Sequence, residues 1–164
     1  MAEILIIGYG SPLRGDDAIG WNAAEELERC FHTDPLVRVI ATQQLTPELA
    51  DDVAASSFVL FLDASSSTKP GEICAARIHA QSAGSSFVHN LSPAWLLATA
   101  KQLRPTAPEA ICITLGGWSF AVGDRISPRA QLRFPELIHE ARAIIAEWQR
   151  KIRASAGSVA SAKP

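Results

Sequence analysis

The sequence has little of what marks several common classes of protein. Its 164 residues include three cysteines, with no Cys-x-x-Cys pair or Cys/His cluster of the kind that holds structural zinc. No apolar run approaches the roughly 20 residues that a membrane-spanning helix needs. The net charge is −2, so electrostatics give no reason to expect nucleic acid or an anionic membrane as a partner. These absences favour an ordinary globular protein without membrane insertion.

Several catalytic and nucleotide-binding motifs are also missing. The chain has no GxxxxGK[ST] phosphate loop and no GxSxG nucleophile elbow. Gly8-Tyr9-Gly10 resembles the start of a dinucleotide loop, but Leu13 stands at the third small position and no acid follows the second apolar segment. No basic region or cleavage site precedes the first apolar segment, so we expect no signal peptide, and three widely spaced cysteines fit a reducing compartment. We therefore expect a cytoplasmic protein that does not bind NAD.

What the sequence does contain is an alternation of apolar strands and amphipathic helices. Fully apolar runs are typical of parallel strands that are covered on both faces of the sheet. The expected strands are residues 4–7, 36–41, 58–62 and 110–115, with a weaker edge strand over 72–79. The expected helices are residues 18–31, 46–55 and 93–103, and a long final helix from 127 to about 152. This order predicts an α/β fold of three layers, a twisted and mainly parallel five-stranded sheet with helices on both faces.

The length predicts one domain, over residues 1–153, followed by a tail over 154–164. The tail is small and polar in composition, so we expect it to be disordered. Right-handed crossovers favour the strand order 2-1-3-4-5. In that order the strands of 4–7 and 58–62 are neighbours, and their connections leave toward opposite faces. Open α/β sheets bind ligands at such a switch point.

Three side chains are expected at this edge of the sheet. Asp17 lies in the loop after the first strand, Asp63 ends the third strand, and His89 precedes the helix that opens at Ser92-Pro93. Neighbouring strands lie roughly 4.8 Å apart, so these groups can converge. Two carboxylates and an imidazole with open positions suit a loosely bound divalent transition metal. The sequence thus predicts a metal and catalytic site made of Asp17, Asp63 and His89.

Each of these residues also has a purely structural interpretation. Asp16 and Asp17 stand where a helix begins, where carboxylates act as capping groups, and Asp16 is the better candidate for that role. Asp63 could close a turn at the strand end, and His89 could be an ordinary loop histidine. The convergence of three suitable groups favours the functional interpretation.

The segment ILIIGYGSPLRGDDAIG, residues 4–20, resembles the opening of the [NiFe]-hydrogenase maturation endopeptidases. Their pattern is a hydrophobic strand followed by Gly-x-Gly-Asn-x-x-x-x-Asp-(Asp/Glu)-x-x-Gly. The resemblance continues through Phe-Leu-Asp63-Ala, Val-His89-Asn-Leu-Ser-Pro and Leu-Gly-Gly-Trp, and covers about residues 3–150.

This resemblance implies the family's α/β fold and its activity, the removal of a C-terminal extension from the large-subunit precursor of a [NiFe] hydrogenase after nickel insertion. It also implies that Asp17, Asp63 and His89 contact nickel. In the family the nickel of the precursor is regarded as the recognition signal, so the free enzyme need not hold a metal.

The chain departs from the family pattern at three places. Ser11 replaces the Asn after the second glycine, which keeps a polar turn residue. Residues 42–45, Thr-Gln-Gln-Leu, stand where members often carry Asp-Gly-Gly, so partner specificity differs if this region shapes the cleft. Ala94 stands where some members place their histidine, and His89 is therefore aligned with members that have His-Asn or His-Gly before Ser-Pro.

Two functions other than proteolysis stay open from the residues. The chain could be a maturation chaperone that senses nickel in the precursor without cutting it. It could also be a small-molecule hydrolase that uses Ser65 or Ser66 with His89, although serines there are more simply loop formers.

Overall fold

The computed structural model describes residues 3–80 and 91–160 of the chain. Within them, five strands form one twisted sheet in the order β2-β1-β3-β5-β4. The strands are β1 (Ile4–Tyr9), β2 (Val37–Thr42), β3 (Phe58–Ser65), β4 (Ile73–Arg77) and β5 (Glu109–Gly116). All neighbouring pairs are parallel except β4 and β5. The sheet is therefore mainly parallel, as predicted.

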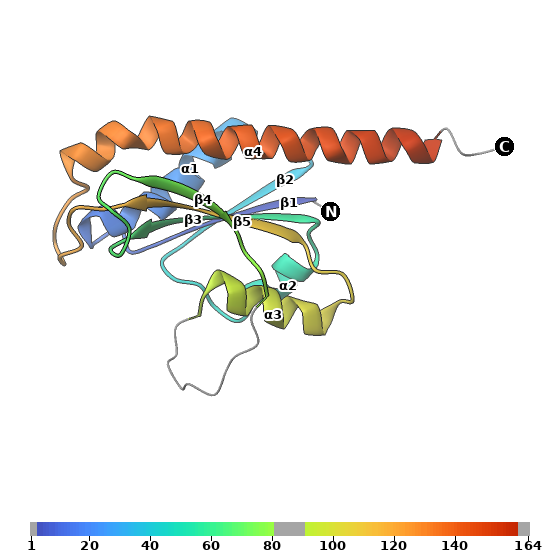
Figure 1. Cartoon of the computed structure of the whole chain (residues 1–164), viewed down its shortest axis with the longest axis horizontal. Coiled ribbons are helices and arrows are strands. Elements are labelled where there is room, and N and C mark those ends of the chain that lie inside the picture. The colour runs from blue at the N-terminus through green and yellow to red at the C-terminus, as the bar shows by residue number, and fades with distance from the viewer. Residues whose placement is uncertain (1–2, 81–90, 161–164) are drawn as a thin grey trace.

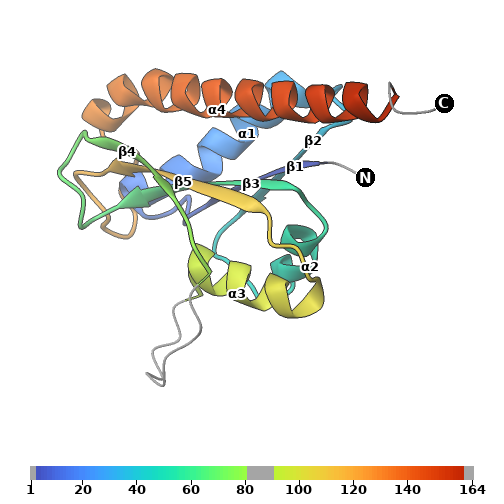
Figure 2. The ribbon, with the colours of Figure 1, turned by 45° about the vertical axis from the view of Figure 1, so that its right-hand side comes forward.

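Helices cover both faces of this sheet. A short 3-10 turn, η1 (Gly15–Ala18), leads into α1 (Ile19–Phe31), and α1 packs on one face together with the long helix α4 (Pro128–Ala160). The opposite face carries α2 (Leu49–Ala54) and α3 (Pro93–Leu103). Both ribbon views show the sheet between these two helical layers (Figures 1 and 2). The predicted three-layer α/β class is confirmed.

Strand β1 shows why the layers form. Its side chains alternate, so Ile4 and Ile6 enter the core beneath α1 and α4, whereas Leu5 and Ile7 enter the core above α2 and α3. All four are 0–1% exposed. A strand that is apolar on both faces is stable only where helices cover both sides, which places β1 in the interior of the sheet.

The predicted strand order 2-1-3-4-5 is wrong for its last two members. Residues 66–72, which connect β3 to β4, are too few for the crossover that parallel neighbours require. The crossover through α3 instead places β5 beside β3, and β4 pairs with β5 in the antiparallel sense at the edge. The more apolar β5 thus takes the interior position beside β3, while Ala75 to Arg77 of β4 are exposed at the edge.

Helix starts agree with the sequence where a side chain caps them. Ser92 accepts a 3.2 Å hydrogen bond from the backbone N–H of Trp95, and α3 begins at Pro93 as predicted. Helix α2 begins later than predicted. Residues 46–48 form a turn in which the carbonyl of Thr46 accepts from Leu49 N–H at 3.2 Å, so Thr46 does not cap α2.

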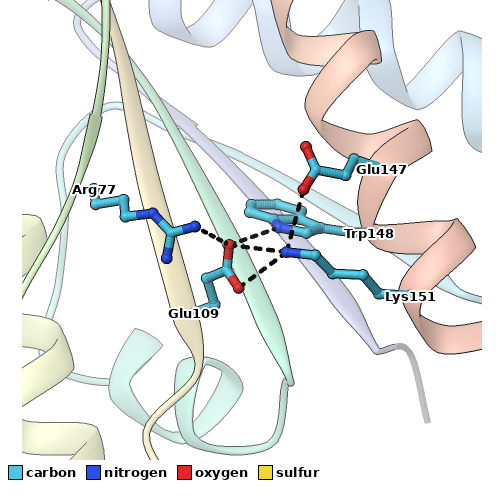
Figure 3. Close-up of polar contacts among 5 residues, drawn as sticks. All are labelled: Arg77, Glu109, Glu147, Trp148 and Lys151. Carbon is cyan, nitrogen blue, oxygen red and sulfur yellow. Dashed lines mark hydrogen bonds and ion pairs between the residues drawn. The ribbon is translucent and has the colours of Figure 1, made fainter. Parts of the chain in front are cut away.

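Helix α4 is fixed to the sheet by a polar cluster at the N-terminal end of β5 (Figure 3). The carboxylate of Glu109 accepts a 3.3 Å hydrogen bond from the indole N–H of Trp148. The same carboxylate pairs with Lys151 and with Arg77, each at 3.3 Å, and Lys151 also pairs with Glu147. Trp148 is 1% exposed and stacks on Phe58 with 5.2 Å between ring centroids.

The last helix extends beyond its predicted end at about residue 152, into the segment expected to be a tail. Helix α4 continues through Arg153 to Ala160, and its far end projects past the sheet (Figure 1). Residues 153–157 are exposed, and no proline interrupts the segment. Residues 161–164 lie outside the described residues. No helix in the described parts of the chain is long and apolar enough to cross a membrane.

Candidate active site

The loop after β1 is folded back tightly on the start of α1. Gly10 has φ +142°, a conformation that L side chains rarely adopt, and a Cβ atom there would lie 1.8 Å from the carbonyl oxygen of Asp17. Gly20 likewise lies against the backbone of β1, where a Cβ atom would be 2.2 Å from the carbonyl oxygen of Tyr9. The two glycines allow the loop of residues 11–17 to lie over the C-terminal end of β1.

This loop also orients Asp17. The backbone N–H of Ser11 donates a 2.7 Å hydrogen bond to Oδ2 of the Asp17 carboxylate. In the described residues Oδ1 has no hydrogen-bond donor. The carboxylate is half-buried, so one oxygen is held by the loop while the other is available to a ligand.

Asp63 lies near the end of β3, the strand beside β1, and it is half-buried. Burial raises the pKa of Asp63 to about 6, and the nearby charge of Asp17 acts in the same direction. Hydrogen bonding from the Tyr9 side chain and from the backbone of Ala64 limits this increase. The carboxyl group of Asp63 can therefore gain or lose a proton close to neutral pH.

Tyr9 and Cys112 lie close enough to Asp63 for its charge to raise the pKa values of both groups. Burial and the negative charge of Asp63 raise the pKa of the Tyr9 hydroxyl, which stays protonated. Burial together with the same charge raises the pKa of the Cys112 thiol to about 12. Both groups are neutral at physiological pH, so neither neutralises the charge of Asp63.

Asp17 and Asp63 line one cleft of about 430 Å³ at the C-terminal edge of the sheet. Its other lining residues are Tyr9, Gly10, Gln43, Gln44, Leu45, Ala64 and Leu91. A second groove of about 690 Å³ adjoins this cleft and shares Asp17, Gln43 and Gln44 with it. The structure thus brings the two predicted acids together at the predicted switch point between β1 and β3.

His89, the third predicted site residue, lies outside the described residues. Its position relative to the two carboxylates therefore stays a prediction. Among residues 3–80 and 91–160, no group of three or more His, Cys, Asp or Glu side chains could hold a metal ion.

The sequence suggested that Asp16 caps the helix beside it, but the structure gives Asp16 other partners. Its side chain is 0% exposed and accepts hydrogen bonds from the backbone N–H groups of Trp118, Ser119 and Ser127, at 2.7, 3.2 and 2.7 Å. The Ser127 hydroxyl donates a further bond of 2.9 Å. Burial would raise the pKa of Asp16, but these hydrogen bonds outweigh it and hold the pKa below its usual value. Asp16 thus joins the loop of Asp17 to the loop that precedes α4.

Ser65, one of the two serines considered as a nucleophile, is engaged in its own loop. The Ser65 hydroxyl accepts hydrogen bonds from the backbone N–H groups of Ser67 and Thr68, at 3.2 and 3.1 Å. These contacts are typical of a turn-forming serine and favour the structural interpretation of this segment.

Some residues of the cleft were not selected from the sequence. Tyr9 lies between Gly8 and Gly10, at the variable position of the Gly-x-Gly motif, so nothing in the sequence was a reason to select it. Gln43 and Gln44 were noted as a departure from the family pattern, and the structure places both in the cleft wall. The position of residues 42–45 directly after a parallel strand was the available signal, since ligand-binding loops follow the C-terminal ends of such strands.

No family model and no curated protein matches the sequence. Solved structures do match. The [NiFe] hydrogenase maturation protease HycI from Thermococcus kodakarensis is similar with a TM-score of 0.71 and 22% identity, over 88% of this chain and 93% of that chain. The hydrogenase maturating endopeptidase HybD from E. coli is similar with a TM-score of 0.63 and 22% identity, over 90% of this chain and 93% of that chain.

The chain has the fold of these maturation proteases. A third similar structure is the hydrogenase 2 maturation peptidase from Thaumarchaeota archaeon SCGC_AB-539-E09, with a TM-score of 0.65, 19% identity and 88% of this chain covered, against 98% of that chain. The similarity extends over nearly the whole length of each chain, so it concerns the sheet together with the helices on both of its faces.

Proposed function

We propose that this chain is a hydrogenase maturation endopeptidase, which removes a C-terminal extension from the large-subunit precursor of a [NiFe] hydrogenase after nickel insertion. The observation that carries the proposal is the shared cleft of Asp17 and Asp63 at the switch point of a maturation-protease fold. The sequence resemblance around the same two acids supports it independently, because it rests on residue types and spacing rather than on the fold.

In this proposal nickel belongs to the substrate and enters the cleft with the precursor. The donor chemistry fits such a role, since Asp17 offers Oδ1 and Asp63 offers a half-buried carboxylate. Carboxylate oxygens without thiolates bind a borderline divalent ion weakly, which suits recognition followed by release. The sequence adds His89 as the third group, and an imidazole would complete a set of oxygen and nitrogen ligands.

The chemistry proposed is hydrolysis of one peptide bond beside this site. Two routes fit the cleft: the substrate's nickel polarises the scissile carbonyl or activates a water, or one carboxylate acts as the general base. Asp63 is a suitable general base, because burial raises its pKa to about 6, close to neutral pH.

The test incubates purified protein with nickel-loaded precursor and measures the mass of the large subunit. We expect the wild-type chain to shorten it, whereas Asp17→Asn, Asp63→Asn and His89→Ala each abolish shortening and keep the wild-type far-UV circular dichroism. Glu140→Gln, a change of an exposed acid on α4, is the matched control and should process normally. An intact precursor with wild-type protein would contradict proteolysis and indicate a nickel-sensing chaperone, while normal processing by all three variants would overturn the site.

A further inference from the structure

The groove that adjoins the catalytic cleft has a chemistry of its own. Its walls come from the loop after β1, from α1 and from the segment after β2, and they include Arg14, Trp21, Thr42 and Gln43. Asp17 lies at the boundary, since it lines both the groove and the cleft. A chain segment that passes Asp63 and Asp17 therefore continues directly into this groove.

Arg14 places a positive charge in the groove. Its side chain is exposed, and within the described residues it forms no ion pair or hydrogen bond. Residues 81–90, which are not described, contain no acidic residue in the sequence. Asp17, which also lines the groove, forms no ion pair with Arg14, and its Oδ2 accepts the hydrogen bond from Ser11. The guanidinium thus presents its donors to whatever enters the groove.

The other walls suit a polypeptide. The side-chain amides of Gln43 and Gln44 can both donate to and accept from peptide groups. Trp21 is half-buried and offers an apolar surface to a neighbouring side chain. An arginine beside such a surface selects a carboxylate, because its planar fork matches the two carboxylate oxygens.

We propose that Arg14 is a specificity-determining residue that binds a carboxylate of the substrate segment lying in this groove, while the scissile bond lies beside Asp17 and Asp63. This inference rests on the proposed function, and it adds the chemical class of the segment next to the cleavage site. The carboxylate is either an Asp or Glu side chain of the precursor or the terminal carboxylate of its extension, and the two sources differ in how they respond to changes in the precursor.

The first experiment measures kcat and KM for processing of nickel-loaded precursor by the full-length protein. Loss of a charge-assisted hydrogen bond predicts that Arg14→Ala raises KM by about 10- to 100-fold and leaves kcat within about threefold of wild type. Arg14→Lys should recover part of this loss, since it keeps the charge but not the fork. Arg125→Ala is the matched control, because Arg125 is exposed and lines neither the groove nor the cleft.

The second experiment identifies the carboxylate by a charge exchange. Asp and Glu residues near the cleavage site of the precursor are replaced one at a time by Lys, and each precursor is tested with Arg14→Glu protein. Recovery of processing at one position identifies a side-chain carboxylate. If instead adding two glycines to the end of the extension raises KM for wild-type but not for Arg14→Ala protein, the terminal carboxylate is the ligand.

The proposal is overturned if KM is unchanged in Arg14→Ala, or if its increase is independent of every carboxylate tested. Failure of this inference and failure of the proposed function are distinguishable. If Asp17→Asn and Asp63→Asn are inactive but Arg14→Ala processes the precursor like wild type, the protease function stands and only the role of Arg14 is refuted. If the wild-type chain does not shorten the precursor, both the protease function and the role of Arg14 are refuted.

Discussion

The carboxylate of Asp16 accepts a 2.7 Å hydrogen bond from the backbone N–H of Ser127, a residue 111 positions later in the chain. Ser127 in turn caps α4, because its hydroxyl oxygen accepts from the backbone N–H of Ala130 at 3.2 Å. The buried acid therefore links the loop of the candidate active site to the start of the helix that covers the sheet. Its neighbour Asp17 is left to face the cleft.

This linkage predicts that Asp16→Asn destabilises the protein. An amide can accept hydrogen bonds with one oxygen only, and its NH₂ group would face backbone N–H donors in a site with 0% exposure. We expect the free energy of unfolding in urea at pH 7 to fall by about 2–3 kcal/mol. Glu140→Gln, at an exposed position, should change it by less than about 0.5 kcal/mol.

Wild type and Asp16→Asn should differ less in stability at acidic pH. Because folding lowers the pKa of Asp16, its ionised form stabilises the fold above the ordinary pKa, and that stabilisation is lost as the pH falls through the folded-state pKa. Asn has no proton to take up, so the stability difference between wild type and Asp16→Asn should shrink from about pH 5 downward. A difference that is constant with pH would contradict the role of the charge.

Asp63→Asn should have the opposite effect on stability. Folding raises the pKa of Asp63 to about 6, so the ionised carboxylate costs stability above that pH, and the cost disappears below the unfolded-state pKa of about 3.9. We expect the inactive variant to be more stable than wild type by about 1–3 kcal/mol at pH 8, and nearly equal to it at pH 4. Denaturant unfolding at the two pH values measures this, and a variant that is less stable at pH 8 would contradict the burial of the charge.

Tyr9→Phe should raise the pKa of Asp63 above about 6. Hydrogen bonding from the Tyr9 side chain stabilises the ionised carboxylate, and phenylalanine removes that donor while it keeps the ring. Asp17→Asn should instead lower the pKa of Asp63, because it removes a nearby negative charge. Carboxyl ¹³C chemical shifts of Asp63, followed against pH, report both changes, and shifts in the same direction for the two variants would refute this account.

Much of the fold could be predicted from local sequence. The apolar run of β1 required helices on both faces, and the serine of Ser92-Pro93 fixed the start of α3 within one residue. The position of β4 could not be predicted in this way. Its place depends on the competition between β4 and β5 for the position beside β3, which the connection lengths and the crossover through α3 decide.

The candidate site shows the same division. Asp17 and Asp63 follow neighbouring parallel strands, so their convergence could be predicted from topology. The role of Asp16 could not, because its donors lie 102 to 111 residues away and the helix beside it offered a simpler local partner. The influence of Tyr9 on Asp63 was equally hidden, since it depends on which face of β1 turns toward the cleft.

The cluster around Glu109 gives a last prediction, about α4. The carboxylate of Glu109 joins β5 to α4 through Trp148 and Lys151 (Figure 3). The Glu109 side chain is 26% exposed. Glu109→Gln keeps the shape but removes the charge that pairs with Lys151 and Arg77, so we expect a loss of about 1–2 kcal/mol in the free energy of unfolding. Glu147→Gln is the matched control, because Glu147 pairs with Lys151 at the surface, where its side chain is 57% exposed, and its loss should cost less than about 0.5 kcal/mol. Equal losses for the two variants would show that α4 is held by its apolar face alone, through Trp148 and the residues packed around it.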